Sequence, residues 1–349
     1  MLGRATGAVL VGVDARLVEV EVHLGGGLPG IAAVGLPDSA VREGIDRLRA
    51  ALPHAGFKLP QRRIIVNLAP AELRKKGTGL DLPIAVALLA ADGQIQSLPT
   101  EGTVLVGELA LDGTLRPVRG ALPFAMAARE AGRRRLVIPS ANVLEARLAE
   151  GIDVVGVGSL ADVAAFTRGI RVPQAGLDTH SALREATAGY CGPDLAEVRG
   201  QAVARRALEV AAAGGHHLLL VGPPGSGKTM LARRLPGILP PMTLEEAIDV
   251  TRVWSAAGLS SGLVTVRPFR SPHHGISFAG LTGGGPRLRP GEVSLANHGV
   301  LYLDEFPEFR RDVLEALRQP LEEGRISVVR IHESATFPTR FMLVASMNP

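Results

Sequence analysis

The eighteen residues 218–235, LLLVGPPGSGKTMLARRL, constrain the fold of this chain more than any other stretch. They join an apolar strand to a basic amphipathic helix through a loop with the pattern G-x-x-x-x-G-K-[ST]. Backbone N–H groups of such a loop can surround phosphate oxygens, and the dipole of the following helix favours negative charge. The order strand, loop, helix predicts an α/β nucleotide-binding domain. The residues expected to contact the nucleotide are Gly222, Pro223, Pro224, Gly225, Ser226, Gly227, Lys228, Thr229 and Met230.

A second apolar strand, GVLYLDEF at 299–306, ends in Asp304 and Glu305. We expect Asp304 and the Thr229 hydroxyl to hold Mg²⁺, while Lys228 binds the β and γ oxygens of ATP. Glu305 would orient or deprotonate the attacking water, which favours hydrolysis over transfer to a small acceptor. No asparagine is followed by lysine, so the N-K-x-D guanine motif is absent from the sequence. The sequence therefore predicts an ATPase rather than a GTPase.

The length of 349 residues predicts two domains, and 46% hydrophobic residues allow each to bury a core. Before the glycine-rich loop, period-two and helical patterns predict an α+β domain over 1–172. Pro, Gly and Thr interrupt these patterns over 173–194, which we interpret as a linker. The second domain then covers 195–349. The predicted elements of the first domain are one or two strands over 8–24, a helix over 38–52, a strand over 62–70, a helix over 79–93, a hairpin over 103–118 and a strand over 134–140.

Cysteine usage and charge limit the functional classes. A single cysteine, Cys191, excludes an internal disulfide, and the longest apolar run, 83–91, is too short for a membrane helix. We therefore expect a cytoplasmic protein without membrane contact. The net charge of +4 permits a polyanionic partner without requiring one.

The stretch 264–291 is rich in glycine and arginine and contains no acidic residue. It either grips DNA phosphates without reading bases, or serves as a subunit contact or a solvated loop. The arginines concerned are Arg267, Arg270, Arg287 and Arg289. The adjacent histidines at 216–217 and 273–274 lack metal-ligand spacing and are interpreted as packing residues.

Three segments, GPPGSGKT, GEVSLANHGVLYLDEFPEF and SMNP, resemble AAA+ ATPases of the magnesium-chelatase type. The N-terminal segments VGLPDSAVREGIDRLRAAL and VGELALDGTLRPVRG narrow the resemblance to the YifB/ComM family. The resemblance covers nearly the whole chain. It implies a first domain with the fold of the Lon proteolytic domain, which is like ribosomal protein S5 domain 2, and a second domain that is an AAA+ motor. It further implies that Asn348, at the end of the strand 340–349, positions the lytic water; taken alone, such an asparagine more often forms a turn.

The same resemblance implies a homo-hexameric ring that uses Mg-ATP to promote branch migration of branched or single-stranded DNA in homologous recombination and natural transformation. In the first domain, Asp81 stands near the position of the Lon nucleophilic serine, and ALPF at 121–124 replaces the expected lysine. This predicts a non-catalytic scaffold. The arginine finger, the sensor arginine and the helical lid of the family would follow Pro349. The chain is thus expected to be truncated before the lid, and to bind ATP but hydrolyse it feebly.

Two alternatives remain open. One is a chelatase-type motor that remodels a protein partner for metal insertion, and the other is a nucleotide-gated assembly module. The roughly 190 residues before the motor favour the DNA motor, because chelatase motor subunits begin near their glycine-rich loop.

Overall fold

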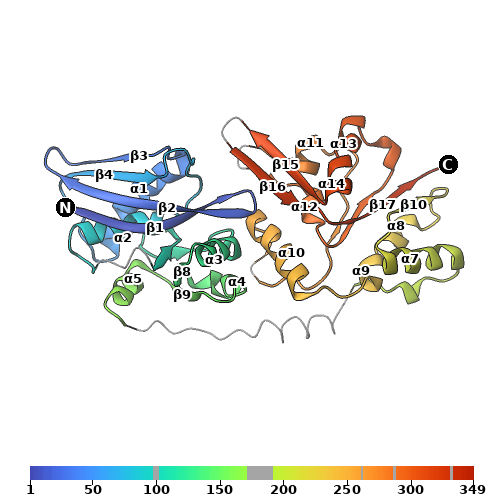
Figure 1. Cartoon of the computed structure of the whole chain (residues 1–349), viewed down its shortest axis with the longest axis horizontal. Helices are drawn as coiled ribbons and strands as arrows, with labels where there is room; N and C mark the ends of the chain where they lie inside the picture. The colour runs from blue at the N-terminus through green and yellow to red at the C-terminus, as the bar shows by residue number, and fades with distance from the viewer. Residues whose placement is uncertain (97–101, 171–191, 261, 286–287, 331–332) are drawn as a thin grey trace. The chain divides into compact units, whose positions relative to one another are not determined.

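The computed structural model describes residues 1–96, 102–170, 192–260, 262–285, 288–330 and 333–349. The chain divides into two compact units, Met1–Leu177 and Asp178–Pro349 (Figure 1). The predicted linker lies almost wholly outside the described residues, as does Cys191. Within the described residues, no helix combines the length and apolar character needed to cross a bilayer.

Unit 1 is built on a mixed seven-stranded sheet in the order β3-β4-β2-β1-β5-β8-β9. The long strands β1 and β2 pair antiparallel, β2 pairs antiparallel with β4, and the other neighbours are parallel. The strands are β1 (Leu2–Val11), β2 (Asp14–Gly25), β3 (Gly30–Val34), β4 (Arg63–Ala69), β5 (Thr103–Leu105), β8 (Arg135–Pro139) and β9 (Asp153–Val157). The helices are α1 (Ser39–His54), α2 (Asp81–Ala91), α3 (Ala121–Glu130), α4 (Val143–Ala146) and α5 (Leu160–Thr167).

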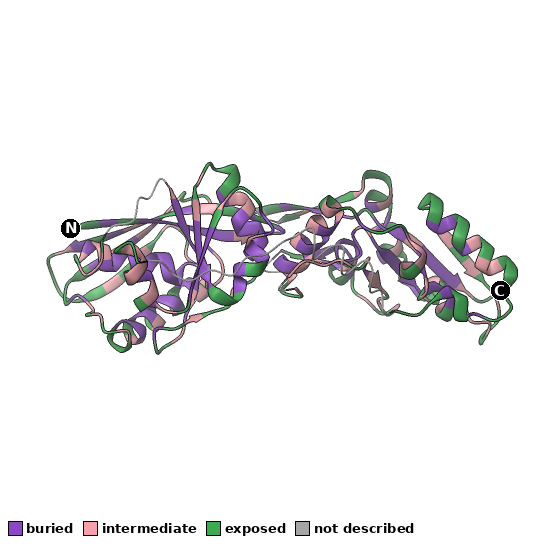
Figure 2. Ribbon diagram, turned by 90° about the horizontal axis from the view of Figure 1, so that it is seen from below, coloured by how far each residue is buried: buried purple, intermediate pink, exposed green. Residues whose placement is uncertain are grey.

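Local sequence explains the two helices that carry most of this core. Helix α1 begins after Asp38, whose carboxylate accepts a hydrogen bond of 3.0 Å from the Val41 amide, as a helix cap does. Its buried residues recur at helical spacing, as predicted. Helix α2 is apolar on every side and is buried along its length except at Ala90. Buried residues, purple in Figure 2, concentrate on the strands and on the helix faces that cover them.

Three expectations for unit 1 need correction. The first strand begins at Leu2 rather than residue 8, and the chain reverses at Gly12, whose φ of +67° suits glycine. The predicted hairpin over 103–118 is short: only β6 (Glu108–Leu109) and β7 (Leu115–Arg116) pair, because β5 joins the main sheet instead. Strand β9 and helix α5 were not predicted, although Ser159 caps α5 by accepting from the Asp162 amide.

Unit 2 contains a parallel four-stranded sheet in the order β10-β17-β14-β11. The strands are β10 (Leu218–Val221), β17 (Met342–Met347), β14 (Val300–Leu303) and β11 (Phe269–Arg270). The helices are α7 (Ala202–Gly214), α8 (Lys228–Ala232), α9 (Leu235–Ile238), α10 (Leu244–Ala257), α11 (Phe278–Thr282), α12 (Glu292–Leu295), α13 (Arg311–Glu315) and α14 (Arg318–Glu323). The strands β15 (Arg325–Arg330) and β16 (Glu333–Pro338) form a separate hairpin.

This strand order determines where the site lies. Because all four strands are parallel, the carboxyl ends of β10, β17 and β14 meet at one edge of the sheet. Unit 2 is thus a mixed α/β domain with a parallel sheet, consistent with a P-loop AAA+ type domain.

Candidate nucleotide-binding site

The glycine-rich loop leads from β10 into α8. Gly225 and Gly227 have φ values of +77° and +86°, a region that residues with a side chain rarely adopt. A Cβ on Gly225 would meet no atom within 4 Å, so the backbone conformation rather than packing requires glycine there. The loop is tethered at Ser226, whose carbonyl accepts a hydrogen bond of 3.1 Å from the Gln201 side chain.

Helix α8 is shorter than the amphipathic stretch predicted over 228–235. It ends at Ala232, and a separate short helix, α9, begins at Leu235 with Pro236 near its start. Proline has no amide hydrogen, so the helical ladder cannot continue unbroken through residue 236. The first turn of α8, which carries Lys228 and Thr229, is unaffected.

Lys228 joins the loop to the neighbouring strand. Its ammonium donates to the Gly222 carbonyl at 2.6 Å, the Pro223 carbonyl at 3.0 Å and Asn348 Oδ1 at 3.1 Å. Asn348 follows β17, which pairs with β10. Two residues 120 positions apart are therefore brought into direct contact by the strand order.

Hydroxyl groups surround Asp304 at the end of β14. Thr229 Oγ1 donates to Asp304 Oδ2 at 2.8 Å, and Ser346 Oγ donates to Asp304 Oδ1. The buried Tyr302 hydroxyl lies 3.1 Å from Thr229 Oγ1 and 3.0 Å from Ser346 Oγ. Burial alone would raise the pKa of Asp304, but the hydrogen bonds from Ser346, Thr229 and Tyr302 outweigh it and lower that pKa below its usual value. Asp304 is therefore held as a carboxylate, which suits a hard cation such as Mg²⁺.

Sequence reasoning missed Tyr302 and Ser346. A signal was available, because side chains two positions apart on a strand share a face. Tyr302 precedes Asp304 by two residues and Ser346 precedes Asn348 by two, so both hydroxyls point toward the same edge as the predicted site residues.

Glu305 lies beside Asp304 with an unusual backbone. Its φ of +54° is left-handed, which costs free energy for a residue other than glycine and is often found at functional sites. Its side chain is 58% exposed, and Oε2 lies 3.2 Å from His274 Nδ1. The amide of Glu305 donates to Asp304 Oδ1 at 3.1 Å.

These residues enclose one cleft of about 370 Å³. The predicted residues Gly222 and Pro223 contribute only their carbonyls, which hold Lys228 from behind. The lining residues are Pro224, Gly225, Ser226, Gly227, Lys228, Thr229, Met230, Asp304, Glu305, Ser346, Met347 and Asn348. The residues fit Mg-ATP in their chemistry, because an ammonium, loop amides, a hydroxyl and a carboxylate converge on the same space.

The four arginines proposed for DNA differ in their surroundings. Arg267 donates to the carbonyls of Pro240 and His298 at 2.6 and 2.7 Å and pairs with Glu246 at 3.0 Å. Arg270 forms a two-pronged ion pair with Glu292 at 2.6 and 2.7 Å. Both guanidinium groups are thus already engaged within unit 2.

The other two arginines are placed differently. Arg289, on the short strand β13 (Arg289–Pro290), is exposed and pairs with no side chain among the residues that the structure describes. Arg287 lies outside the described residues.

Histidine pairs in the described part of the chain do not assemble into a cluster of three or more metal-binding side chains. His217 Nδ1 instead accepts a hydrogen bond of 3.0 Å from the Leu343 amide. His273 Nδ1 accepts one of 3.0 Å from the Gly275 amide. Both interactions fit the packing interpretation.

Unit 1 contains charged side chains too, but they are enclosed. Asp81 is 1% exposed and pairs with Arg47, whose Nε and Nη2 lie 3.0 and 2.9 Å from Asp81 Oδ2. The Leu109 amide donates to the same oxygen at 3.2 Å. Burial raises the pKa of Asp81 to about 7, against the opposing effect of Arg47. That unit 1 is a non-catalytic scaffold stays a prediction.

Comparison with known proteins places both units. The model described as magnesium chelatase, subunit ChlI, matches residues 194–349, and the model described as subunit ChlI of Mg-chelatase matches 20–142. The chain is 48% identical to competence protein ComM of Haemophilus influenzae, over 97% of this chain and 67% of that protein. It is 45% identical to protein YifB of Escherichia coli, over 97% of this chain and 66% of that protein. The chain belongs to the YifB/ComM family.

Membership of this family confirms the resemblance seen in the motifs. YifB/ComM proteins carry a magnesium-chelatase-like part, and the chain accordingly belongs among AAA+ proteins. More distant similarity extends to the magnesium-chelatase 67 kDa subunit of Heliobacterium mobile, at 26% identity over 44% of this chain. The chain spans about two thirds of the length of its YifB and ComM relatives.

Proposed function

We propose that this chain binds Mg-ATP in the cleft at the edge of the unit 2 sheet and hydrolyses it to drive movement of DNA strands. The observation that carries the ATPase is the convergence of Lys228, Asp304 and Asn348 from three neighbouring strand ends on one cleft. Bound Mg-ATP would supply the phosphoanhydride bond whose cleavage releases free energy.

Each residue has a distinct task in this proposal. Loop amides from Gly225 to Thr229 and the Lys228 ammonium bind phosphate oxygens, while Thr229 and Asp304 hold Mg²⁺. Glu305 takes a proton from the attacking water, and Asn348 orients that water. The contact between Lys228 and Asn348 supports this, because it links the phosphate-binding side chain to the water-orienting one.

DNA is proposed as the partner on two grounds. One relative is named a competence protein, and the family resemblance implies branch migration in homologous recombination and natural transformation. Arg289 is exposed within a stretch that contains no acidic residue, which suits contact with phosphates. The proposed assembly is a homo-hexameric ring in the cytoplasm.

A chelatase-type motor acting on a protein partner is the second candidate. The match of residues 194–349 to a magnesium-chelatase model favours it. A nucleotide-gated assembly module would bind ATP in the same cleft without turnover, because Glu305 would then have no catalytic task.

ATPase rates with different DNA structures separate these candidates. A protein of the full length of the relatives is assayed with a four-way junction, a duplex, a single strand and no DNA. The DNA motor predicts the strongest stimulation by the junction, and equal rates under all four conditions would exclude it. Absence of turnover with intact ATP binding would instead favour the assembly module.

Filter binding tests the arginines. Changing Arg287 and Arg289 to Ala should weaken DNA binding and lower the dependence of log K on log salt by about 0.9 per lost phosphate contact. Arg325→Ala, in which an exposed arginine paired with Glu323 is lost, serves as the control.

A further inference from the structure

His274 makes a contact with Glu305 that neither the motifs nor the family comparison assigns. The imidazole Nδ1 lies 3.2 Å from Glu305 Oε2, while the rest of the Glu305 side chain borders the cleft. The two residues are 31 positions apart, and His274 comes from the loop between β11 and α11. The contact is therefore a product of the tertiary fold.

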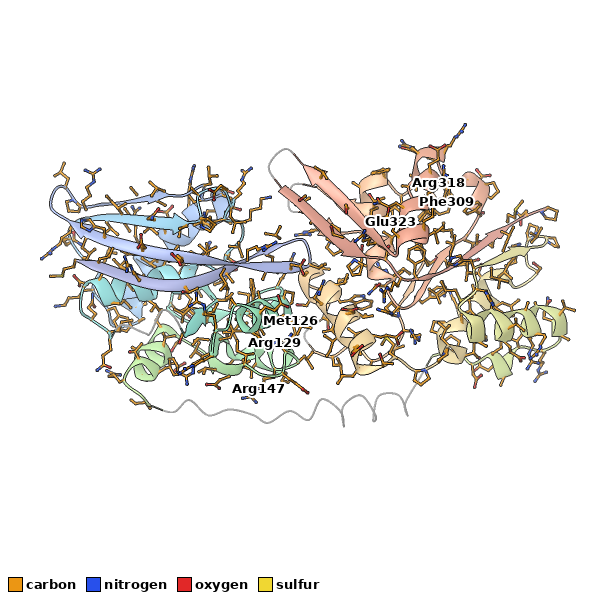
Figure 3. The ribbon with its side chains drawn as sticks, viewed as in Figure 1. Met126, Arg129, Arg147, Phe309, Arg318 and Glu323 are labelled. Carbon is orange, nitrogen blue, oxygen red and sulfur yellow. The ribbon has the colours of Figure 1, made fainter. Side chains whose placement is uncertain are left out.

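The ring of His274 is fixed by its neighbours. It lies against the ring of His273, with centroids 4.0 Å apart, and meets Phe309 edge-on at 6.4 Å. Phe309, labelled in Figure 3, is 4% exposed and provides a buried wall. The His273 carbonyl accepts a hydrogen bond of 2.9 Å from the Ile276 amide, which closes the loop in a turn. The imidazole is thus presented to Glu305 by a packed loop.

Glu305 needs such a support. An exposed ion pair contributes little to stability, so the contact is not explained by folding. A carboxylate that deprotonates water must be held in one orientation, and a long exposed side chain has many rotamers. A donor on Oε2 restricts these rotamers and leaves Oε1 to accept a proton.

We propose that His274 is a positioning residue for Glu305, donating from Nδ1 to Oε2 so that Oε1 faces the reacting water. The proposal rests on the ATPase function proposed above. His274 itself touches neither nucleotide nor water.

Substitutions at residue 274 test this geometry. In asparagine the amide nitrogen can occupy the place of imidazole Nδ1, whereas the glutamine amide extends farther, toward the place of Nε2. We measure single-turnover hydrolysis with protein in excess over Mg-ATP, and the Kd of a non-hydrolysable analogue. His274→Ala should slow hydrolysis about tenfold with Kd unchanged, as loss of one charge-assisted hydrogen bond predicts. His274→Asn should restore most of the rate and His274→Gln should not.

Two further comparisons make the test specific. His216→Ala, which removes an exposed histidine elsewhere in unit 2, should leave both quantities unchanged. In a Glu305→Gln protein, His274→Ala should cause no additional loss, because the two residues act as one unit. A rate for His274→Ala equal to or above the wild type, equal rescue by Gln and Asn, or a parallel change in Kd would each overturn the proposal.

NMR keeps the proposal testable if the wild-type chain hydrolyses no ATP, an outcome that would count against the ATPase function alone. The imidazole nitrogens of His274 should show a protonated Nδ1, and Glu305→Ala should shift that resonance. An unchanged Nδ1 resonance in Glu305→Ala would show that the pair does not form.

Discussion

Unit 1 and unit 2 each place charged side chains where a glycine-containing loop leads into a helix, but they treat the charges in opposite ways. In unit 1, Lys75 and Asp81 precede and begin α2, and both are buried. Lys75 donates to the Pro70 carbonyl, and Asp81 pairs with Arg47. In unit 2, Lys228 and Asp304 border an open cleft.

The pKa shifts follow from this difference. Burial raises the pKa of Asp81 to about 7 and outweighs the nearby Arg47. Burial also acts on Asp304, but hydrogen bonds from Ser346, Thr229 and Tyr302 prevail and lower its pKa. Buried charges with permanent protein partners maintain a fold, whereas charges at a cleft can exchange partners for a ligand. Each prediction below would break or sharpen this comparison.

The largest effect is expected from Glu305→Gln. Removal of the proposed general base should lower single-turnover hydrolysis by about 10²–10⁴-fold while ATP binding is retained. Glu308→Gln, on the same exposed turn, is the matched control and should leave the rate unchanged. A retained rate in Glu305→Gln would remove the proposed role of this residue.

Arg47→Met should destabilise unit 1 by about 3–5 kcal/mol, because it leaves the Asp81 carboxylate buried without its ion-pair partner. Methyl NMR signals of Leu82 and Leu89 during a urea titration report on unit 1. Fluorescence of the single tryptophan, Trp254, reports on unit 2 and should not change. Arg49→Met, which removes an arginine that is 49% exposed, should cost at most about 0.5 kcal/mol. Equal effects of the two substitutions would show that the buried pair is not structural.

The stability of unit 1 should fall as the pH rises from about 4 to about 7. The folded pKa of Asp81 is raised from 3.8 to about 7, so the folded state binds more protons than the unfolded state in this interval. The stabilisation is complete below the unfolded pKa and is lost as the pH rises through the folded pKa, with an upper bound of about 4 kcal/mol. The same urea titrations at several pH values measure it, and Asp81→Asn should flatten the profile. A profile that stays equally steep in Asp81→Asn would assign the effect to another group.

Lys228→Met should weaken binding of an ATP analogue by about 10–100-fold, as expected for loss of a charged contact to phosphate. Isothermal titration calorimetry measures the Kd. Arg233→Met, which removes an exposed cation just after α8, should change the Kd less than about twofold. If both substitutions weakened binding equally, general positive charge rather than the loop would explain the affinity.

The smallest effect is expected from Tyr302→Phe. It removes a hydroxyl near Thr229 and Ser346, a contact worth about 0.5–1.5 kcal/mol. The Mg²⁺ concentration needed for half-maximal ATP binding should rise about two- to tenfold, while binding without Mg²⁺ is unchanged. A matching loss of affinity without Mg²⁺ would instead indicate general damage to the fold.

The sequence determined the features that depend on neighbouring residues. The loop 222–229, the acidic end of β14, the cap at Asp38 and the apolar face of α1 could all be read locally, because capping and periodicity act over a few residues. Even the missed β9 and α5 had local signals, such as the cap at Ser159.

Only the tertiary structure decided which distant groups meet. The contacts of Lys228 with Asn348, Thr229 with Asp304, and His274 with Glu305 join residues that are 120, 75 and 31 positions apart. The order of the parallel strands creates the first two, and a loop folded against Phe309 creates the third. The engagement of Arg267 and Arg270 with glutamates likewise depends on elements far along the chain. Local physical chemistry specifies which side chains an element offers, whereas strand order and packing specify what they touch.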